Sequence, residues 1–371
     1  MQQERIVVKI GSNVLTRRDG SLDITRLSAL VDQLAELRRH GFSIMLVSSG
    51  AVASGRGELR DLPDAARLDQ VSARQLFSAV GQAKLINRYY ELFREHGIHC
   101  GQVLATKENF ARRSHYLNQQ HCIEAMLAHG VIPIVNENDT VSVTELMFTD
   151  NDELSGLIAT MTGASKLIIL SNIDGLYTGD PADPESRLIA RVEPGQDPTS
   201  FIAASKSTLG RGGMSSKCRI ARRVAAEGTE VIIANGKREG ILQSLCRLPD
   251  APEAPHTLFV PAPEAASSLK KWIAHSDSFA KGSLGVNSGA ADALLRGGAS
   301  LLPVGVTTVS GDFDAGDIVT VNAPDGKVIA WGRVAVDSQT ASGLAGRAGQ
   351  KALIHADYLY VDETNNFRDN S

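Results

Sequence analysis

Two lysines stand where a protein commonly binds an anion. Lys9 closes an apolar, strand-like segment and is followed by Gly11, which lets a ligand approach the backbone. Such a lysine is costly to bury unless it meets an anion, although at a sheet edge it can extend to water. Lys217 follows a glycine-rich loop, residues 210–213, and lies in the first turn of an expected helix. Helix N-termini favour phosphate and disfavour an unpaired cation, so this loop predicts a bound anion.

Acidic and amide side chains form two clusters that flank one loop. Residues 136–139 read Asn-Glu-Asn-Asp directly after an apolar strand, and residues 150–152 read Asp-Asn-Asp at the start of an expected helix. Asp139 can bind an ammonium group, and the amides can bind carboxylate oxygens. The pattern suits an amino-acid ligand, and the alternative is a polar turn followed by a helix N-cap.

Hydroxyl groups follow a third strand, at Ser48 and Ser49, before Gly50. They either contact a ligand or act as an ordinary serine N-cap. Other chemistries lack their motifs, because the chain has no Walker A loop, GxGxxG, GxSxG or HExxH. Cys218, beside Lys217 at a helix start, is either a thiol of lowered pKa or a packed helix residue, and we favour packing.

The elements that must position these loops alternate along the first two-thirds of the chain. Apolar segments predict strands over residues 6–10, 43–48, 101–105, 131–135, 166–171 and 230–234. Amphipathic patterns predict helices over residues 25–40, 66–96, 115–129, 152–161 and 214–227. This alternation predicts an α/β fold with an open, mainly parallel sheet sandwiched by helices. Ligands bind beyond the carboxyl ends of such strands, where the loops above lie.

Five prolines punctuate residues 249–263, which we expect to hold neither a helix nor a central strand. Beyond them, short β-like runs at 301–309, 317–321 and 328–336 predict a small β-rich second domain. A length of 371 residues agrees with two domains.

The composition is that of an ordinary globular protein, with 43% hydrophobic and 22% charged residues. A net charge of −4 excludes a globally basic nucleic-acid surface. Apolar runs are too short for a membrane span, and a strand begins too soon after Met1 for a signal peptide. The four cysteines show no close pairing. We therefore expect a cytoplasmic protein with reduced thiols and no membrane partner.

Taken together, seven motifs resemble the amino-acid kinase family, and within it the glutamate 5-kinase group. In chain order they are KIGSN, VSSGAVASGR, AVGQAKL, VNENDTV, DNDELS, LIILSNIDGLYTGDP and GRGGMSSK. The segment from Trp272, which includes GASLLPVGVTTVSGDFDAGD, resembles a PUA domain. The resemblance implies an amino-acid kinase domain over residues 1–258 and a small β-barrel PUA domain over residues 274–355.

The resemblance also implies a reaction: ATP and Mg²⁺ phosphorylate the γ-carboxylate of L-glutamate, the first step of proline synthesis. It implies the following site residues: Lys9, Asp152 and Lys217 for catalysis; Ser49, Asp139 and Asn151 for glutamate; and Lys9, Ser171, Asn172, Arg211, Gly212, Gly213, Met214, Ser215, Ser216 and Lys217 for ATP. No protein ligand of Mg²⁺ is implied. The family further implies inhibition by proline, a homo-oligomer, and association with γ-glutamyl phosphate reductase.

Three positions depart from the family pattern, and two alternative functions stay open. Ser171-Asn172 replaces a frequent threonine-aspartate pair, Ser12-Asn13 replaces threonine-serine, and Arg211 replaces a threonine. These changes bear on nucleotide affinity.

The fold also suits kinases of other small carboxylates, of carbamate or of a nucleotide, although a nucleotide acceptor calls for arginines. A PUA domain also suits an RNA-binding regulator, but residues 256–371 hold nine Lys or Arg against twelve Asp or Glu, a poor balance for phosphate backbones.

Overall fold

The computed structural model describes residues 3–17, 19–62, 68–111, 113–141, 151–198, 213–263 and 280–361. The chain divides into two compact units, one of Met1–Thr106 with Gln119–Ala265 and the other of Lys107–Asn118 with Ala266–Ser371. The domain limits expected from the resemblance, 1–258 and 274–355, stay predictions.

An eight-stranded sheet, ordered β3-β4-β2-β1-β5-β9-β10-β8, forms the centre of the first unit. Its strands are β1 (Arg5–Ile10), β2 (Ser43–Ser48), β3 (Cys100–Ala105), β4 (Ile132–Glu137), β5 (Lys166–Ser171), β8 (Arg191–Val192), β9 (Glu230–Asn235) and β10 (His256–Phe259). Neighbouring strands pair in parallel except for the antiparallel pair of β9 and β10. The prediction of an open, mainly parallel sheet is confirmed.

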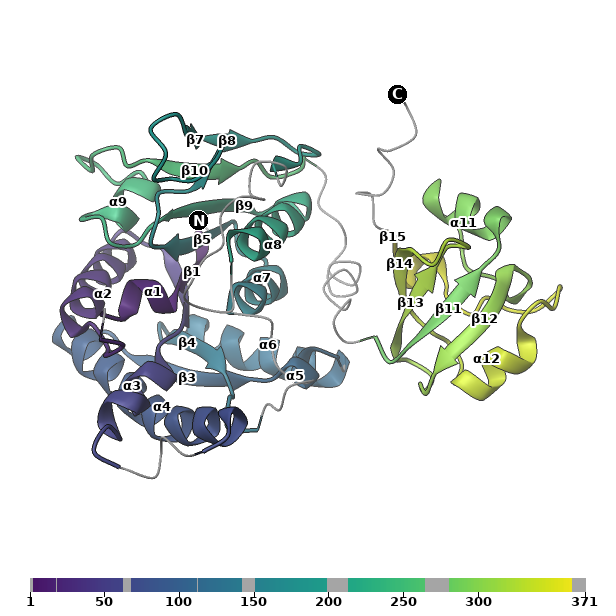
Figure 1. Ribbon diagram of the computed structural model, residues 1–371, viewed down its shortest axis with the longest axis horizontal. Helices are drawn as coiled ribbons and strands as arrows, with labels where there is room; N and C mark the ends of the chain where they lie inside the picture. The colour runs from purple at the N-terminus through teal and green to yellow at the C-terminus, as the bar shows by residue number, and fades with distance from the viewer. Residues whose placement is uncertain are drawn as a thin grey trace. The chain divides into compact units, whose positions relative to one another are not determined.

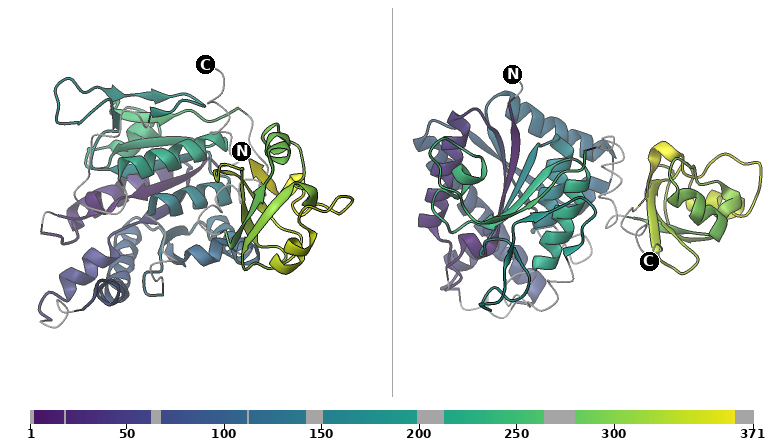
Figure 2. Two further views of the ribbon diagram at one scale, coloured as in Figure 1. Left: turned by 45° about the vertical axis from the view of Figure 1, so that its right-hand side comes forward. Right: turned by 90° about the horizontal axis from the view of Figure 1, so that it is seen from above.

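Helices cover both faces of this sheet (Figure 1). The α-helices described in the first unit are α1 (Ser12–Leu15), α2 (Ile24–Arg39), α3 (Ala51–Glu58), α4 (Gln70–Glu95), α6 (Arg113–Ala128, from Gln119 onward), α7 (Asn151–Thr162), α8 (Met214–Ala226) and α9 (Ile241–Leu245). Figure 2 shows α2 and α9 on one face and α7 and α8 on the other. Because both faces are covered, β2 and β4 are buried along their whole length.

Helices α3 and α4 pack with their backbones in contact, because glycines stand at the crossing. A Cβ atom on Gly81 would lie 1.8 Å from the carbonyl oxygen of Ala51, and one on Gly55 would lie 1.8 Å from that of Phe77. No side chain fits at either position. This close packing joins two helices that border the site described below.

Two expectations from the sequence were wrong in detail. The proline-rich segment does hold an inner strand, since β10 lies between β9 and β8; its four residues contain no proline, so the ladder hydrogen bonds can form. Strand β4 extends to Glu137, so Asn136 and Glu137 pair with β3 and do not belong to the following loop. The other expected strands and helices of the first unit are present within a few residues of the predicted limits.

The second unit contains a five-stranded sheet, ordered β12-β11-β13-β14-β15, and short helices. Its described elements include α5 (Lys107–Ala111), β11 (Gly282–Val286), α11 (Ser288–Leu295), β12 (Val306–Gly311), β13 (Ile318–Asn322), β14 (Val328–Arg333), α12 (Ser338–Leu344) and β15 (Leu359–Val361). The predicted β-rich second domain is confirmed, although the sequence did not indicate β11 or β15. Among the described helices of the chain, none is long and apolar enough to cross a membrane.

Candidate functional site

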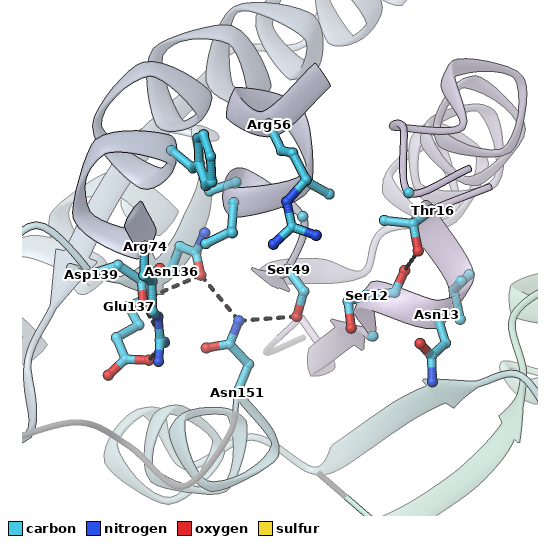
Figure 3. A pocket seen from close by; sticks show the side chains of 18 of the residues that line it. Ser12, Asn13, Thr16, Ser49, Arg56, Arg74, Asn136, Glu137, Asp139 and Asn151 are labelled. Carbon is cyan, nitrogen blue, oxygen red and sulfur yellow. Dashed lines mark hydrogen bonds and ion pairs between the residues drawn. The ribbon is translucent and has the colours of Figure 1, made fainter. Parts of the chain in front are cut away.

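A cavity of about 980 Å³ opens at the carboxyl ends of β1, β2, β4 and β5. Part of its wall is shown in Figure 3. Seven of the residues predicted from the sequence line it: Lys9, Ser49, Asp139, Asn151, Asp152, Ser171 and Lys217. They come from distant segments, and the parallel sheet brings them together because its strands end at one edge.

Asp152 lies between the two predicted lysines. Its Oδ1 is 2.5 Å from Nζ of Lys9, and its Oδ2 is 2.9 Å from Nζ of Lys217. The Asp152 side chain is fully buried, and the lysine side chains are 5% and 10% exposed. Burial opposes ionisation of Asp152, but the attraction of Lys9 and then Lys217 outweighs it and lowers the pKa of the carboxyl. The trio carries more positive than negative charge, which suits a phosphoryl group.

Local structure explains why these three charges meet. Lys9 is the penultimate residue of β1, and Asp152 lies in the first turn of α7, where the helix dipole favours an acid. Lys217 occupies the first turn of α8, where the dipole disfavours a cation. The ion pair with Asp152 offsets that cost for Lys217. Lys9 is also buried and paired with Asp152, so the alternative in which its side chain extends to water is wrong.

Asn151 connects three segments of the cavity wall (Figure 3). Its Nδ2 donates to Ser49 Oγ at 3.0 Å, to Asn136 Oδ1 at 3.1 Å and to the carbonyl oxygen of Ser48 at 3.2 Å. Ser49 is therefore not a helix cap. The N-cap of α3 is Gly50, in a left-handed conformation at φ 105° with no side-chain cap hydrogen bond.

Three arginines of the cavity wall were missed in the sequence: Arg56, Arg74 and Arg60. Arg56, on α3, extends toward the cavity, and its guanidinium lies 5.6 Å from the ring centroid of Phe77 (Figure 3). Arg74, on α4, forms ion pairs with Glu137 and Asp139.

A signal for Arg74 was present in the sequence. Arg74, Ser78 and Gln82 recur at intervals of four within an expected helix, which places three polar side chains on one face. In the structure, Ser78 Oγ donates to Asp139 Oδ2 at 3.2 Å, and Gln82 Nε2 donates to the carbonyl oxygen of Glu137 at 3.2 Å.

Not every predicted nucleotide-binding residue lines the cavity. Ser171, at the end of β5, does so, whereas the exposed Asn172 does not, although Ser171 Oγ donates to its Oδ1 at 3.4 Å. Gly213 is the N-cap of α8 and has no side-chain cap hydrogen bond; Met214, Ser215 and Ser216 form the first turn but not the cavity wall. The predicted residues Arg211 and Gly212 lie outside the described residues.

The thiol of Cys218 is a packed core group. The residue is fully buried, and burial raises the pKa of the thiol to about 12. The alternative of a reactive cysteine is therefore wrong. Within the described part of the chain, no group of three or more His, Cys, Asp or Glu side chains could hold a metal ion.

The fold and site define a class, the α/β proteins with a charged cavity beyond the carboxyl ends of a mainly parallel sheet. The family model "Amino acid kinase family" matches residues 4–235, and the model "PUA domain" matches residues 282–353. Glutamate 5-kinase from Bacteroides thetaiotaomicron is 59% identical over 98% of this chain and 100% of its own length. The enzyme of the same name from Chlorobaculum tepidum is 45% identical over 96% of this chain and 97% of its own length. The one from Trichlorobacter lovleyi is 38% identical over 98% of this chain and 95% of its own length.

The chain therefore belongs to the amino acid kinase family and, within it, to the glutamate 5-kinases with a C-terminal PUA domain. The resemblance inferred from the seven sequence motifs is confirmed.

Proposed function

We propose that the protein transfers the γ-phosphoryl group of ATP to the γ-carboxylate of L-glutamate, giving γ-glutamyl phosphate and ADP. In this reaction a carboxylate oxygen forms a bond to phosphorus while the bond to the β–γ bridging oxygen breaks. The observation that carries the proposal is the placement of Asp152 between Lys9 and Lys217 in a cavity that Asp139 and Asn151 also line.

The chemistry needs charge neutralisation and alignment more than proton transfer. A carboxylate is already an anionic nucleophile at neutral pH, so the reaction needs no general base. Its barrier lies in bringing two anions together in line, and fixed cations lower that barrier. Lys9 and Lys217 supply two such cations in a largely buried position.

Each charged residue of the trio has a distinct role in the proposal. Lys9 binds the transferring phosphoryl group, and Lys217 stabilises the bridging oxygen as the β–γ bond breaks. Asp152 orients both lysines, because each of its carboxylate oxygens contacts one of them. Mg²⁺ supplies further positive charge on the phosphate oxygens, which are its usual ligands, and we assign it no protein ligand.

The remaining predicted residues bind the two substrates. Asp139 takes the glutamate ammonium group, while Ser49 and Asn151, which are hydrogen-bonded to each other, hold the acceptor. Ser171, Asn172 and the segment 211–217, from Arg211 to Lys217, bind ATP.

The decisive experiment is ATP-dependent hydroxamate formation, with hydroxylamine as the trap for an acyl phosphate. L-Glutamate, L-aspartate, N-acetyl-L-glutamate and a reaction without acceptor are compared at equal Mg²⁺. We expect a signal with L-glutamate alone, because only this acceptor has both the ammonium group and the required chain length. A stronger signal with another acceptor, or none with any, contradicts the proposal.

The proposal places the enzyme in the cytoplasm, at the first step of L-proline synthesis, with proline as an inhibitor at the acceptor site. It includes a homo-oligomer and an association with γ-glutamyl phosphate reductase, which would protect a labile product. The PUA domain is assigned a structural or regulatory role, because its acidic balance opposes RNA binding.

A further inference from the structure

Arg74 lies against two buried carboxylates of the cavity wall (Figure 3). Its Nη2 donates to Glu137 Oε2 at 3.1 Å and also to Asp139 Oδ1. The side chains of Glu137 and Asp139 are 4% and 7% exposed, whereas that of Arg74 is 22% exposed. One guanidinium thus pairs with two carboxylates at the cavity wall, and the three side chains together carry a formal charge of −1.

This arrangement complements the two charges on the α-carbon of an amino acid. The ammonium group matches the excess negative charge at Asp139, and the α-carboxylate needs a cation. Both groups are bonded to the same carbon, so that cation must lie beside the carboxylate that takes the ammonium group. Arg74 meets this condition because it contacts Asp139 directly. Its planar guanidinium also matches the geometry of a carboxylate.

The position of Arg74 is set by helix α4 and strand β4. Ser78 and Gln82, on the same helix face, bind Asp139 and the backbone of Glu137. Glu137 holds the guanidinium from the sheet side, at the end of β4. The guanidinium can therefore exchange its contact with Asp139 for a ligand while Glu137 still holds it in place.

We propose that Arg74 binds the α-carboxylate of the acceptor and thereby selects amino acids whose α-carboxylate is free. This inference rests on the proposed function, in which the ammonium group of glutamate binds Asp139. When glutamate enters, the ammonium group replaces Arg74 at Asp139, and the α-carboxylate binds Arg74. Arg74 does not touch the reacting γ-carboxylate, so its contribution is to acceptor affinity and specificity.

The competing explanation is that Arg74 only neutralises Glu137 and Asp139. The two explanations differ in how they depend on the acceptor. A purely structural loss lowers activity with every acceptor alike. The loss of an α-carboxylate contact affects only acceptors that carry that charge.

The test compares L-glutamate with L-isoglutamine, which keeps the ammonium group and the γ-carboxylate but has an uncharged α-carboxamide. Both acceptors are assayed with the wild type, Arg74→Gln and Arg88→Gln. Arg88 is a matched control on the same helix, where it pairs with Glu91 at 2.8 Å outside the cavity lining. For Arg74→Gln we expect kcat/KM for L-glutamate to fall about 10- to 100-fold, mainly through KM, as for loss of a charged hydrogen bond.

For the same variant, we expect kcat/KM for L-isoglutamine to change by less than about threefold, and Arg88→Gln to change neither acceptor. Where turnover of L-isoglutamine is too slow to follow, its inhibition constant against L-glutamate provides the same comparison. Arg74→Lys keeps the charge but loses the planar fork, and we expect a smaller loss confined to L-glutamate. This variant serves as the test if Arg74→Gln does not fold.

Equal losses with the two acceptors overturn the inference and make Arg74 a structural partner of Asp139. That result leaves the proposed function intact, because the wild type still phosphorylates L-glutamate. A folded wild type that phosphorylates neither acceptor overturns the proposed function and the inference with it.

Discussion

Asn151 and Asp152 are consecutive residues, yet they serve different parts of one cavity. Asn151 donates a hydrogen bond to Ser49 Oγ at 3.0 Å, on the side of the proposed acceptor. Asp152 forms ion pairs with the ammonium groups of Lys9 and Lys217. The first turn of α7 therefore fixes the acceptor side relative to the phosphoryl side. A rigid link of this kind suits in-line transfer, in which small displacements of the reacting groups cost much of the rate.

Replacement of either lysine is expected to affect turnover far more than folding. Lys9→Ala and Lys217→Ala each remove a cation from the reacting phosphate, and we expect kcat to fall about 100- to 1000-fold. Steady-state kinetics together with circular dichroism measure the two effects. Lys84→Ala is the matched control, because Lys84 pairs with Glu58 on the surface and should leave kcat within about twofold of the wild type. A normal kcat in either site variant removes that lysine from the mechanism.

Asp152→Asn is expected to destabilise the fold at neutral pH. The change removes the carboxylate charge that contacts both buried lysines, and breaking such a buried pair costs about 3–5 kcal/mol of unfolding free energy. Urea unfolding at several pH values measures the cost. Asp174→Asn is the control. Asp174 is also an aspartate whose pKa an arginine, Arg238, holds low, but that arginine is 44% exposed. Loss of this exposed ion pair should cost about 1 kcal/mol or less of unfolding free energy.

The difference in unfolding free energy between the wild type and Asp152→Asn should depend on pH with a defined sign. The pKa of Asp152 is lowered in the folded protein, although burial alone would raise it, because Lys9 and Lys217 attract the carboxylate. Its stabilising effect is therefore complete above the unfolded-state pKa of about 3.9 and is lost as the pH falls through the lower folded-state pKa. Wild type and Asp152→Asn should converge in stability in that acidic range. A stability difference that grows as the pH falls contradicts the assignment.

Gly81→Ala is expected to disrupt the packing of α3 against α4. The added methyl carbon would lie 1.8 Å from the carbonyl oxygen of Ala51, so the helices must separate. We expect a loss of about 1–3 kcal/mol or more, and a raised KM for glutamate because α4 carries Arg74. Gly57→Ala, on α3, meets no atom within 4 Å and should stabilise the protein by up to about 1 kcal/mol through helix propensity. Thermal unfolding compares the two, and equal stability would show that the helices are not held by this contact.

L-Proline is expected to compete with L-glutamate. It carries a charged amino group and an α-carboxylate on one carbon, as glutamate does, and should engage Asp139 in the same way. Glutamate saturation curves at several millimolar concentrations of L-proline should show a rising apparent KM, and D-proline, the mirror image, should act more weakly. Curves that L-proline leaves unchanged contradict a shared site.

The sequence by itself determined six of the eight strands of the main sheet, five of the described helices and seven of the residues that line the candidate site. Strands buried on both faces, such as β2 and β4, are continuous apolar runs, and that signal is local. Because ligands bind beyond the carboxyl ends of parallel strands, the segments after β1, β2 and β4 could be singled out without a structure. Lys9 and Lys217 stood out because a cation is unusual at the end of a buried strand or in a first helical turn. Asp139 and Asp152 stood out because they belong to two clusters of acidic and amide residues that flank one loop.

Only the tertiary structure decided which of these charges touch and which other residues join them. The contact of Asp152 with both lysines depends on how α7 packs against β1 and against α8, and nothing in the neighbouring sequence encodes that distance. The sequence places Arg74 on a polar face of a long helix, but only the position of α4 beside Glu137 and Asp139 shows what that face contacts. Contacts between distant segments depend on the packing of whole elements, whereas periodicity along the chain reports only which face of an element is buried.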